Sequence, residues 1–128
     1  MSGVLLDTDV LIDHIRGRRH LDAHGASVSV VTRTELFAGH EREEPAVEAL
    51  LGRLAEIDVT PDIARRAGRI RRTTGLDVAD AIIAATALKL DMTVMTRNRR
   101  HFERVSGLSL RVPDDPAGSP PGTKRSAN

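Results

Sequence analysis

The sequence predicts an α/β protein whose central sheet is mostly parallel and is covered by helices on both faces. Short apolar runs alternate along the chain with segments whose apolar residues have helical spacing, and this alternation is typical of parallel sheets. The 128 residues and 40% hydrophobic content suit one globular domain with a substantial core. We expect this domain to cover residues 1–112. Residues 113–128 are rich in Pro, Gly and Ser, which predicts a disordered tail.

The first half of the chain is expected to contain three strands. In order, its predicted elements are strand 4–6, helix 10–16, a short helix 19–24, strand 27–31, helix 32–40, helix 45–55 and strand 57–59. Gly17 and Gly39 are predicted to end two of these helices, and Pro45 is predicted to begin a third.

The second half is expected to contain the central helix of the protein. Its predicted elements are helix 61–74, helix 78–90, strand 93–96, helix 98–104 and strand 108–112. Thr60 is a capping residue for the first of these helices, and Gly75 ends it. Helix 78–90 is rich in Ala and apolar almost all round, so we expect it to be buried.

Acidic residues follow apolar runs at separate points of the chain. Asp7 comes after strand 4–6, Glu35 lies just past strand 27–31, and Asp80 lies at the start of the central helix. Ligands of parallel sheets collect at the carboxyl ends of the strands, so we expect these side chains and Asn98 to share one edge. Buried carboxylates are costly when unpaired, and they raise each other's pKa. A divalent cation would relieve both costs.

Helix capping is the alternative explanation for several of these residues. Glu35 could close a capping box with Thr32, while Asp77 and Asn98 could each cap the helix that follows. Taken singly, capping is the favoured interpretation of Glu35, Asp77 and Asn98. Asp7 is harder to explain in this way because it follows an apolar strand directly. The repeated placement at one sheet edge is what favours a joint site.

Composition excludes several kinds of chemistry. The chain has no cysteine, so disulfides, thiolate metal sites and cysteine nucleophiles are excluded. Phe37 and Phe102 are its only aromatic residues of the Phe, Trp and Tyr class, which argues against base stacking as a means of holding nucleic acid. The N-terminus lacks a signal-peptide pattern, and no apolar stretch is long enough to span a bilayer. We therefore expect a soluble cytoplasmic protein.

Four stretches carry the candidate site residues in a fixed order. They are LDTDVLI at 6–12, VTRTEL at 31–36, DAIIAATA at 80–87 and VMTRN at 94–98, the last followed by Phe102. Together they resemble the PIN-domain ribonucleases, specifically the VapC-type toxins of bacterial toxin–antitoxin pairs. The resemblance implies a three-layer PIN-like fold and an endoribonuclease that cuts structured RNA such as tRNA.

The resemblance also implies which residues form the site. The acidic cluster of the family falls on Asp7, Glu35 and Asp80, and its fourth position falls on Asn98. Many relatives have an acid at this fourth position, so the Asn leaves occupancy of a second metal subsite open. His101 is a further departure, because an Asp is frequent there.

Two more positions match polar residues that support the site in the family. These positions are Asp9 and Thr96. Basic residues near the strand ends are candidates for RNA contact, because an acidic cleft alone repels RNA. We name Arg16, Arg97, Arg99 and Arg100 as these candidates.

An all-oxygen site suits Mg²⁺, and Mn²⁺ as an alternative. Such an ion would orient and acidify a water for in-line attack on a phosphodiester. We expect Asp7 and Asp80 to be direct ligands. Glu35 would be a further ligand or would position the water, and Asn98 would hold a water or a phosphate oxygen.

The family further implies a homodimer and a cognate antitoxin. Leu50, Leu51 and Leu54 of helix 45–55 could form a groove for either partner, or they could be ordinary core residues. A catalytically silent PIN domain that binds RNA or protein is an alternative function. A haloacid-dehalogenase-type phosphatase is a further one, but Lys89 and Lys124 are poorly placed to be its phosphate-binding lysine.

Overall fold

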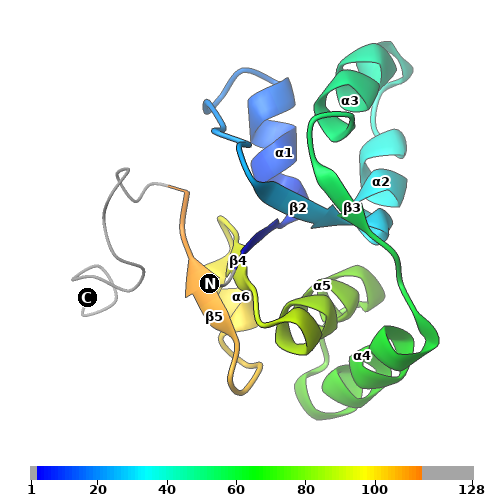
Figure 1. Cartoon of the computed structure of the whole chain (residues 1–128), viewed down its shortest axis with the longest axis vertical. Coiled ribbons are helices and arrows are strands. Elements are labelled where there is room, and N and C mark those ends of the chain that lie inside the picture. Colours follow the sequence, from blue (N-terminus) through cyan, green and yellow to red (C-terminus); the bar gives the residue numbers. More distant parts are fainter. Residues whose placement is uncertain (1–2, 114–128) are drawn as a thin grey trace.

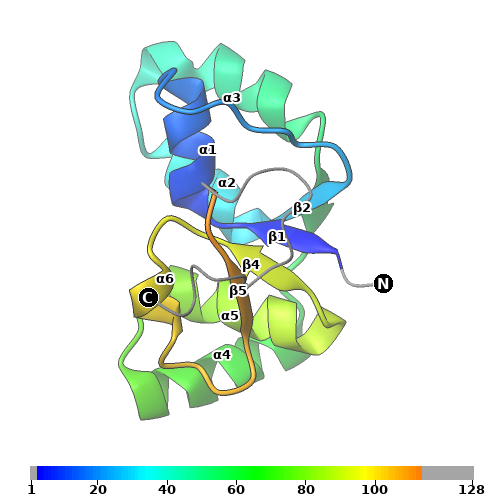
Figure 2. The same cartoon turned by 90° about the vertical axis from the view of Figure 1, so that its left-hand side faces the viewer.

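A parallel sheet between two layers of helices forms the protein (Figures 1 and 2). The computed structural model describes residues 3–113. The strand order is β3-β2-β1-β4-β5, and every adjacent pair among the described strands is parallel. The strands are β1 Val4–Leu6, β2 Ala26–Ser29, β3 Ala55–Ile57, β4 Thr93–Met95 and β5 Ser109–Arg111. The expected α/β architecture is confirmed.

Each face of the sheet carries its own group of helices (Figure 1). On one face lie α1 Thr8–Ile15, α2 Val30–Phe37, the short 3₁₀ helix η1 Glu41–Glu43 and α3 Glu44–Leu51. On the other lie α4 Pro61–Thr74, α5 Val78–Leu90 and α6 Arg99–Phe102. Because successive strand residues point to opposite faces, Leu5 joins the core under α4 and α5, whereas Leu6 joins the core under α1 and α3.

Helix α5 is the buried central helix that the sequence predicts. Six of its residues are buried, five of them apolar and the sixth Thr86. Helix α4 begins and ends as predicted: the Thr60 hydroxyl accepts a hydrogen bond from Ile63 N at 3.1 Å, and Gly75 ends the helix with a φ of 77°. No helix within residues 3–113 has the length and apolar character needed to cross a membrane.

The predicted helix 19–24 is wrong. Residues 20–23 have no helical structure and His24 begins a turn; Leu21 and Ala23 are buried, whereas Asp22 between them and His24 after them are exposed. Alternate burial is typical of extended chain, and the backbone N–H of Leu21 donates to His14 Nδ1 at 3.1 Å. Tertiary packing of two apolar side chains therefore decides this conformation.

Two strand boundaries also differ from those predicted. Strand β2 ends at Ser29, whose hydroxyl accepts from Val31 N at 3.1 Å and caps α2, so this helix begins two residues before the predicted start. Strand β3 is Ala55–Ile57, two residues ahead of the predicted strand 57–59. Its register against β2, with Ser27 opposite Ala55, fixes this position.

The leucines in and just after α3 are core residues. Leu50 and Leu51 end this helix and Leu54 follows it, and all three are buried in the same core as residues of α1 and β2, so the interpretation of these leucines as a partner groove is wrong. The domain boundary at residue 112 stays a prediction. The tail predicted for 113–128 lies outside the described residues, except for Pro113.

Gly68 inside α4 and Gly75 at its end are expected to respond oppositely to replacement by alanine. Gly75→Ala should lower the free energy of unfolding by about 1–2 kcal/mol, because an L residue is strained at positive φ. Gly68→Ala, in the exposed interior of the same helix with no atom within 4 Å of an added Cβ, should raise it by about 0.5–1 kcal/mol. Urea unfolding measures both changes, and a rise for Gly75→Ala would contradict this account of the helix end.

Candidate metal centre

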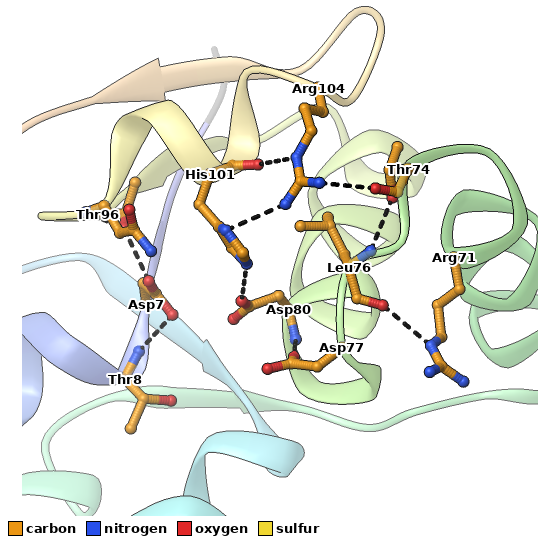
Figure 3. A network of polar contacts seen from close by, with 11 residues as sticks. Asp7, Thr8, Arg71, Thr74, Leu76, Asp77, Asp80, Thr96, His101 and Arg104 are labelled. Atoms are coloured by element: carbon orange, nitrogen blue, oxygen red, sulfur yellow. Dashed lines mark hydrogen bonds and ion pairs between the residues drawn. The ribbon is translucent and has the colours of Figure 1, made fainter.

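Asp7 lies at the junction of β1 and α1. Its backbone N–H donates to Met95 O at 2.9 Å, which holds the end of β1 against β4. Its carboxylate caps α1, with Oδ1 accepting from Thr8 N at 2.8 Å. Oδ2 accepts from the Thr96 hydroxyl at 2.7 Å (Figure 3). The side chain is therefore fixed at the carboxyl edge of the sheet by groups from two adjacent strand ends.

Burial makes a negative charge on Asp7 costly. The residue is only 6% exposed. This burial, followed by the nearby charges of Asp9 and Asp80, raises the pKa of the Asp7 carboxyl from 3.8 to about 7, although the hydrogen bonds from Thr96 and Thr8 oppose the rise. An ionised Asp7 would thus be stabilised by a cation placed against it.

Asp80 occupies the first turn of α5 and is close enough to Asp7 to affect its pKa. Its backbone N–H donates to Asp77 Oδ1 at 2.9 Å, so the capping interpretation of Asp77 is confirmed. Burial, then Asp77, and then Glu35 and Asp9 raise the pKa of Asp80 to about 6, and His101 opposes this rise. The five carboxylates near this edge, those of Asp7, Asp9, Glu35, Asp77 and Asp80, therefore share one electrostatic environment.

The contact between His101 and Asp80 was not predicted from the sequence. Its Nε2 lies 3.0 Å from Asp80 Oδ2, and its Nδ1 lies 3.2 Å from Arg104 Nη2 (Figure 3). A guanidinium can only donate, so Nδ1 is the acceptor and Nε2 carries the hydrogen that points to Asp80. Arg104 also donates to Thr74 O at 2.8 Å. The ring is thus held between Asp80 and the end of α4.

Glu35 is held within α2 by a hydroxyl from α1. Its Oε1 accepts from the Thr8 hydroxyl at 2.5 Å, and the hydroxyls of Thr8 and Thr32 lie 3.0 Å apart. Ser29, and not Thr32, caps α2. The capping-box interpretation of Glu35 is therefore wrong.

Asn98 approaches the same edge from the turn after β4. Its backbone N–H donates to the Thr96 hydroxyl at 2.9 Å, the same hydroxyl that donates to Asp7. Its exposed side chain makes no capping bond to α6, so the capping interpretation of Asn98 is wrong. The amide group is available for a ligand.

Three of the four candidate arginines lie against acidic groups. Arg16 Nε is 2.9 Å from Glu43 Oε2, and Arg97 Nε is 3.1 Å from Asp13 Oδ2. Arg99 Nε lies 3.2 Å from Glu103 Oε2 but without hydrogen-bond geometry. We regard this last contact as a Coulombic one. Arg100 has neither an ion pair nor a hydrogen-bonded side chain among residues 3–113.

The donor set suits a hard divalent cation, although its members are not already gathered around one point. Within residues 3–113, no three side chains of the His, Cys, Asp and Glu class are arranged to hold an ion. Asp7 and Asp80 nevertheless offer carboxylate oxygens whose ionised forms lack a full counter-charge. Carboxylate, amide and water oxygens are the ligands that Mg²⁺ and Mn²⁺ prefer.

Comparison with known proteins agrees with this arrangement. A family model described as PIN domain matches residues 4–108. Ribonuclease VapC19 of Mycobacterium tuberculosis is 38% identical over 113 residues, which cover 77% of this chain and 90% of that protein. The tRNA(fMet)-specific endonuclease VapC of Salmonella typhimurium is 31% identical over 128 residues, with 86% and 97% covered.

Solved structures show the same fold. A DNA-bound VapBC from Salmonella typhimurium superposes with a TM-score of 0.78 at 27% identity, covering 88% of this chain and 98% of that one. A toxin–antitoxin complex from Klebsiella pneumoniae gives a TM-score of 0.72 at 30% identity, with 83% and 95% covered. The chain belongs to the PIN-domain family, among its VapC ribonucleases. The resemblance and the three-layer fold are thereby confirmed, and the phosphatase alternative is set aside.

Asp7→Asn should stabilise the metal-free protein more at high pH than at low pH. The folded-state pKa of about 7 lies above the ordinary 3.8, so the stability that the protonated carboxyl contributes is lost as pH rises through 7. Asn resembles the protonated form. At 1.36 kcal/mol per pKa unit, we expect the gain from Asn to be larger at pH 8 than at pH 5 by about 2–3 kcal/mol.

Chemical unfolding in EDTA at the two pH values measures this difference. Asp58→Asn is the matched control, because it removes the same charge from an exposed position, and it should change stability little at either pH. Equal gains at pH 5 and pH 8 for Asp7→Asn would show that burial of the charge is not the cause.

Proposed function

We propose that this PIN-domain ribonuclease is the toxin of a toxin–antitoxin pair and hydrolyses RNA phosphodiester bonds with Mg²⁺ or Mn²⁺ held by Asp7 and Asp80. The observation that carries the proposal is the buried carboxylate of Asp7 beside that of Asp80. Both carboxyls have raised pKa values, which a divalent cation would lower by favouring their ionised forms.

Each remaining residue of the centre has a proposed role that follows from its contacts. Thr96 fixes the rotamer of Asp7 through its hydroxyl, and His101 fixes that of Asp80 through Nε2. Glu35, held by Thr8 at Oε1, directs its second oxygen toward an attacking water. When bound, the metal supplies Lewis acidity and lowers the pKa of water. The exposed Asn98 amide donates to a phosphate oxygen, and Asp9 supports the turn that carries it.

Structured RNA, such as tRNA, is the proposed substrate. The names of the relatives support RNA, and that of the Salmonella typhimurium protein specifies tRNA(fMet). With only two Phe and no Tyr or Trp in the chain, recognition would rest on RNA shape and 2′-hydroxyls instead of base stacking. Arg100 is the strongest of the four candidate arginines for phosphate contact, because the acidic partners of Arg16 and Arg97 compete with RNA.

Asp80→Asn is expected to lower RNA cleavage at least about 100-fold, because a bound metal contributes several kcal/mol to the transition state. Asp7→Asn should do the same, and EDTA should abolish cleavage by the wild type. The measurement is the rate of cleavage of total RNA and of purified tRNA pools in Mg²⁺ or Mn²⁺.

Asp77→Asn is the control for this experiment. It removes a carboxylate from the N-cap of α5, three residues before Asp80, yet Asn caps a helix as well as Asp does, so its rate should stay within about threefold of wild type. Cleavage that persists in EDTA, or equal rates for Asp80→Asn and Asp77→Asn, would end the metal-dependent assignment. No cleavage of any RNA pool would favour a catalytically silent PIN domain, in which the contact with His101 keeps the Asp80 carboxylate from binding a metal.

The proposal includes a homodimer and a cognate antitoxin, both in the cytoplasm with the RNA. The solved relatives are complexes of toxin with antitoxin. We expect light scattering to give twice the chain mass of 13.9 kDa for the isolated protein, and addition of the antitoxin to suppress cleavage. A mass of 13.9 kDa at micromolar concentration would contradict the dimer.

A further inference from the structure

Asp13 is a buried carboxylate that lies outside the proposed metal centre. Its side chain is 5% exposed and faces inward from α1. Oδ1 lies 3.1 Å from Arg18 Nη1, and Oδ2 lies 3.1 Å from Arg97 Nε. Arg18 comes just after α1, whereas Arg97 belongs to the turn after β4. Asp13 therefore joins α1 to the turn that carries Asn98.

The same turn is held to α1 at a second point. Arg97 N donates to Asp9 Oδ1 at 3.4 Å, and Arg97 Nε lies 4.0 Å from Asp9 Oδ2. Asp9 and Asp13 are four residues apart on α1, so they lie on one face of the helix. Both the backbone and the side chain of Arg97 are thus fixed against that face.

Arg97 stands between the two residues of the turn that reach the site. The Thr96 hydroxyl donates to Asp7, and the backbone N–H of Asn98 donates to that same hydroxyl. Helix α6 has only four residues, and it holds Asn98 through one backbone bond from His101 N to Asn98 O at 3.1 Å, while the Asn98 side chain makes no bond to it. Since α1 itself begins at the Asp7 cap, an attachment of Arg97 to α1 sets the position of Asn98 relative to Asp7.

We infer that Asp13 and Arg97 are positioning residues, whose ion pair fixes the turn 96–98 so that Asn98 meets the substrate phosphate beside Asp7. This inference rests on the proposed function. It assigns Arg97 to the architecture of the site instead of to RNA contact, because two carboxylates already oppose its charge. A misplacement of about 1 Å in a catalytic group can cost on the order of 100-fold in rate.

A double-mutant cycle tests the pair. Asp13→Leu replaces the buried carboxylate with an apolar side chain of similar size, and it leaves no charge buried without a partner, because the side chains of Arg18 and Arg97 are 56% and 52% exposed. Arg97→Met removes the guanidinium. Arg18→Met is the matched control, because it removes the other partner of Asp13 without touching the turn. Each variant is compared in kcat, KM and urea unfolding.

Asp13→Leu and Arg97→Met should each lower kcat about 10- to 100-fold with little change in KM. The double variant should be no slower than the slower single variant, because the two residues act as one unit. Arg18→Met should stay within about threefold of wild type. Independent losses that multiply would overturn the inference. A higher KM for Arg97→Met with normal kinetics for Asp13→Leu would assign Arg97 to RNA contact.

Amide hydrogen exchange in the metal-free protein gives a readout that does not need activity. The Asn98 N–H, bonded to Thr96 Oγ1, should exchange at least about tenfold faster in Asp13→Leu and Arg97→Met but not in Arg18→Met. Unchanged exchange in all three variants would overturn the positioning role. If the wild type cuts no RNA while exchange changes as expected, the proposed function fails and the positioning of the turn stands.

Discussion

The hydrogen bond from the Thr96 hydroxyl to Asp7 Oδ2 is the contact on which the arrangement of the centre depends. Asp7 ends β1 and caps α1, and Thr96 follows β4, so one 2.7 Å bond joins two adjacent strand ends. The same hydroxyl accepts from Asn98 N. The parallel pairing of β1 with β4 brings these groups together, since it aligns their carboxyl ends at one edge.

Burial is what gives this edge its chemistry. The layers above and below the sheet exclude water from Asp7 and partly from Asp80, and that exclusion raises both pKa values. The fold therefore leaves carboxylates whose charges are poorly compensated by the protein. A cation becomes the natural complement of such a site, and hydrolysis of a charged phosphodiester becomes chemically reasonable there.

The spacing of apolar residues and the positions of capping residues and glycines were sufficient to predict most of the fold. The apolar character of residues 78–90 predicted α5. Thr60 and Gly75, as the capping residues at its two ends, predicted the limits of α4. The segment 19–24 was mispredicted because its two buried residues depend on the sheet beneath them, which local sequence does not encode. The start of α2 was misplaced because Ser29 caps it while still belonging to β2.

The sequence predicted the acidic residues of the candidate site but not the residues that contact them. Motif order named Asp7, Glu35 and Asp80 as candidates. The capping role of Glu35 assumed that Thr32 begins α2, but Ser29 caps this helix. Asn98 stands at the start of α6, but its side chain makes no bond to that helix. The contact between His101 and Asp80 joins residues 21 positions apart, and no local pattern predicts such a pair. Arg104 adds a consequence of its own. The Arg104 guanidinium can only donate hydrogen bonds, so it selects the His101 tautomer whose Nδ1 accepts and whose Nε2 carries the hydrogen. Arg104 thereby determines that His101 donates a hydrogen bond to Asp80, although Arg104 itself does not contact that carboxylate.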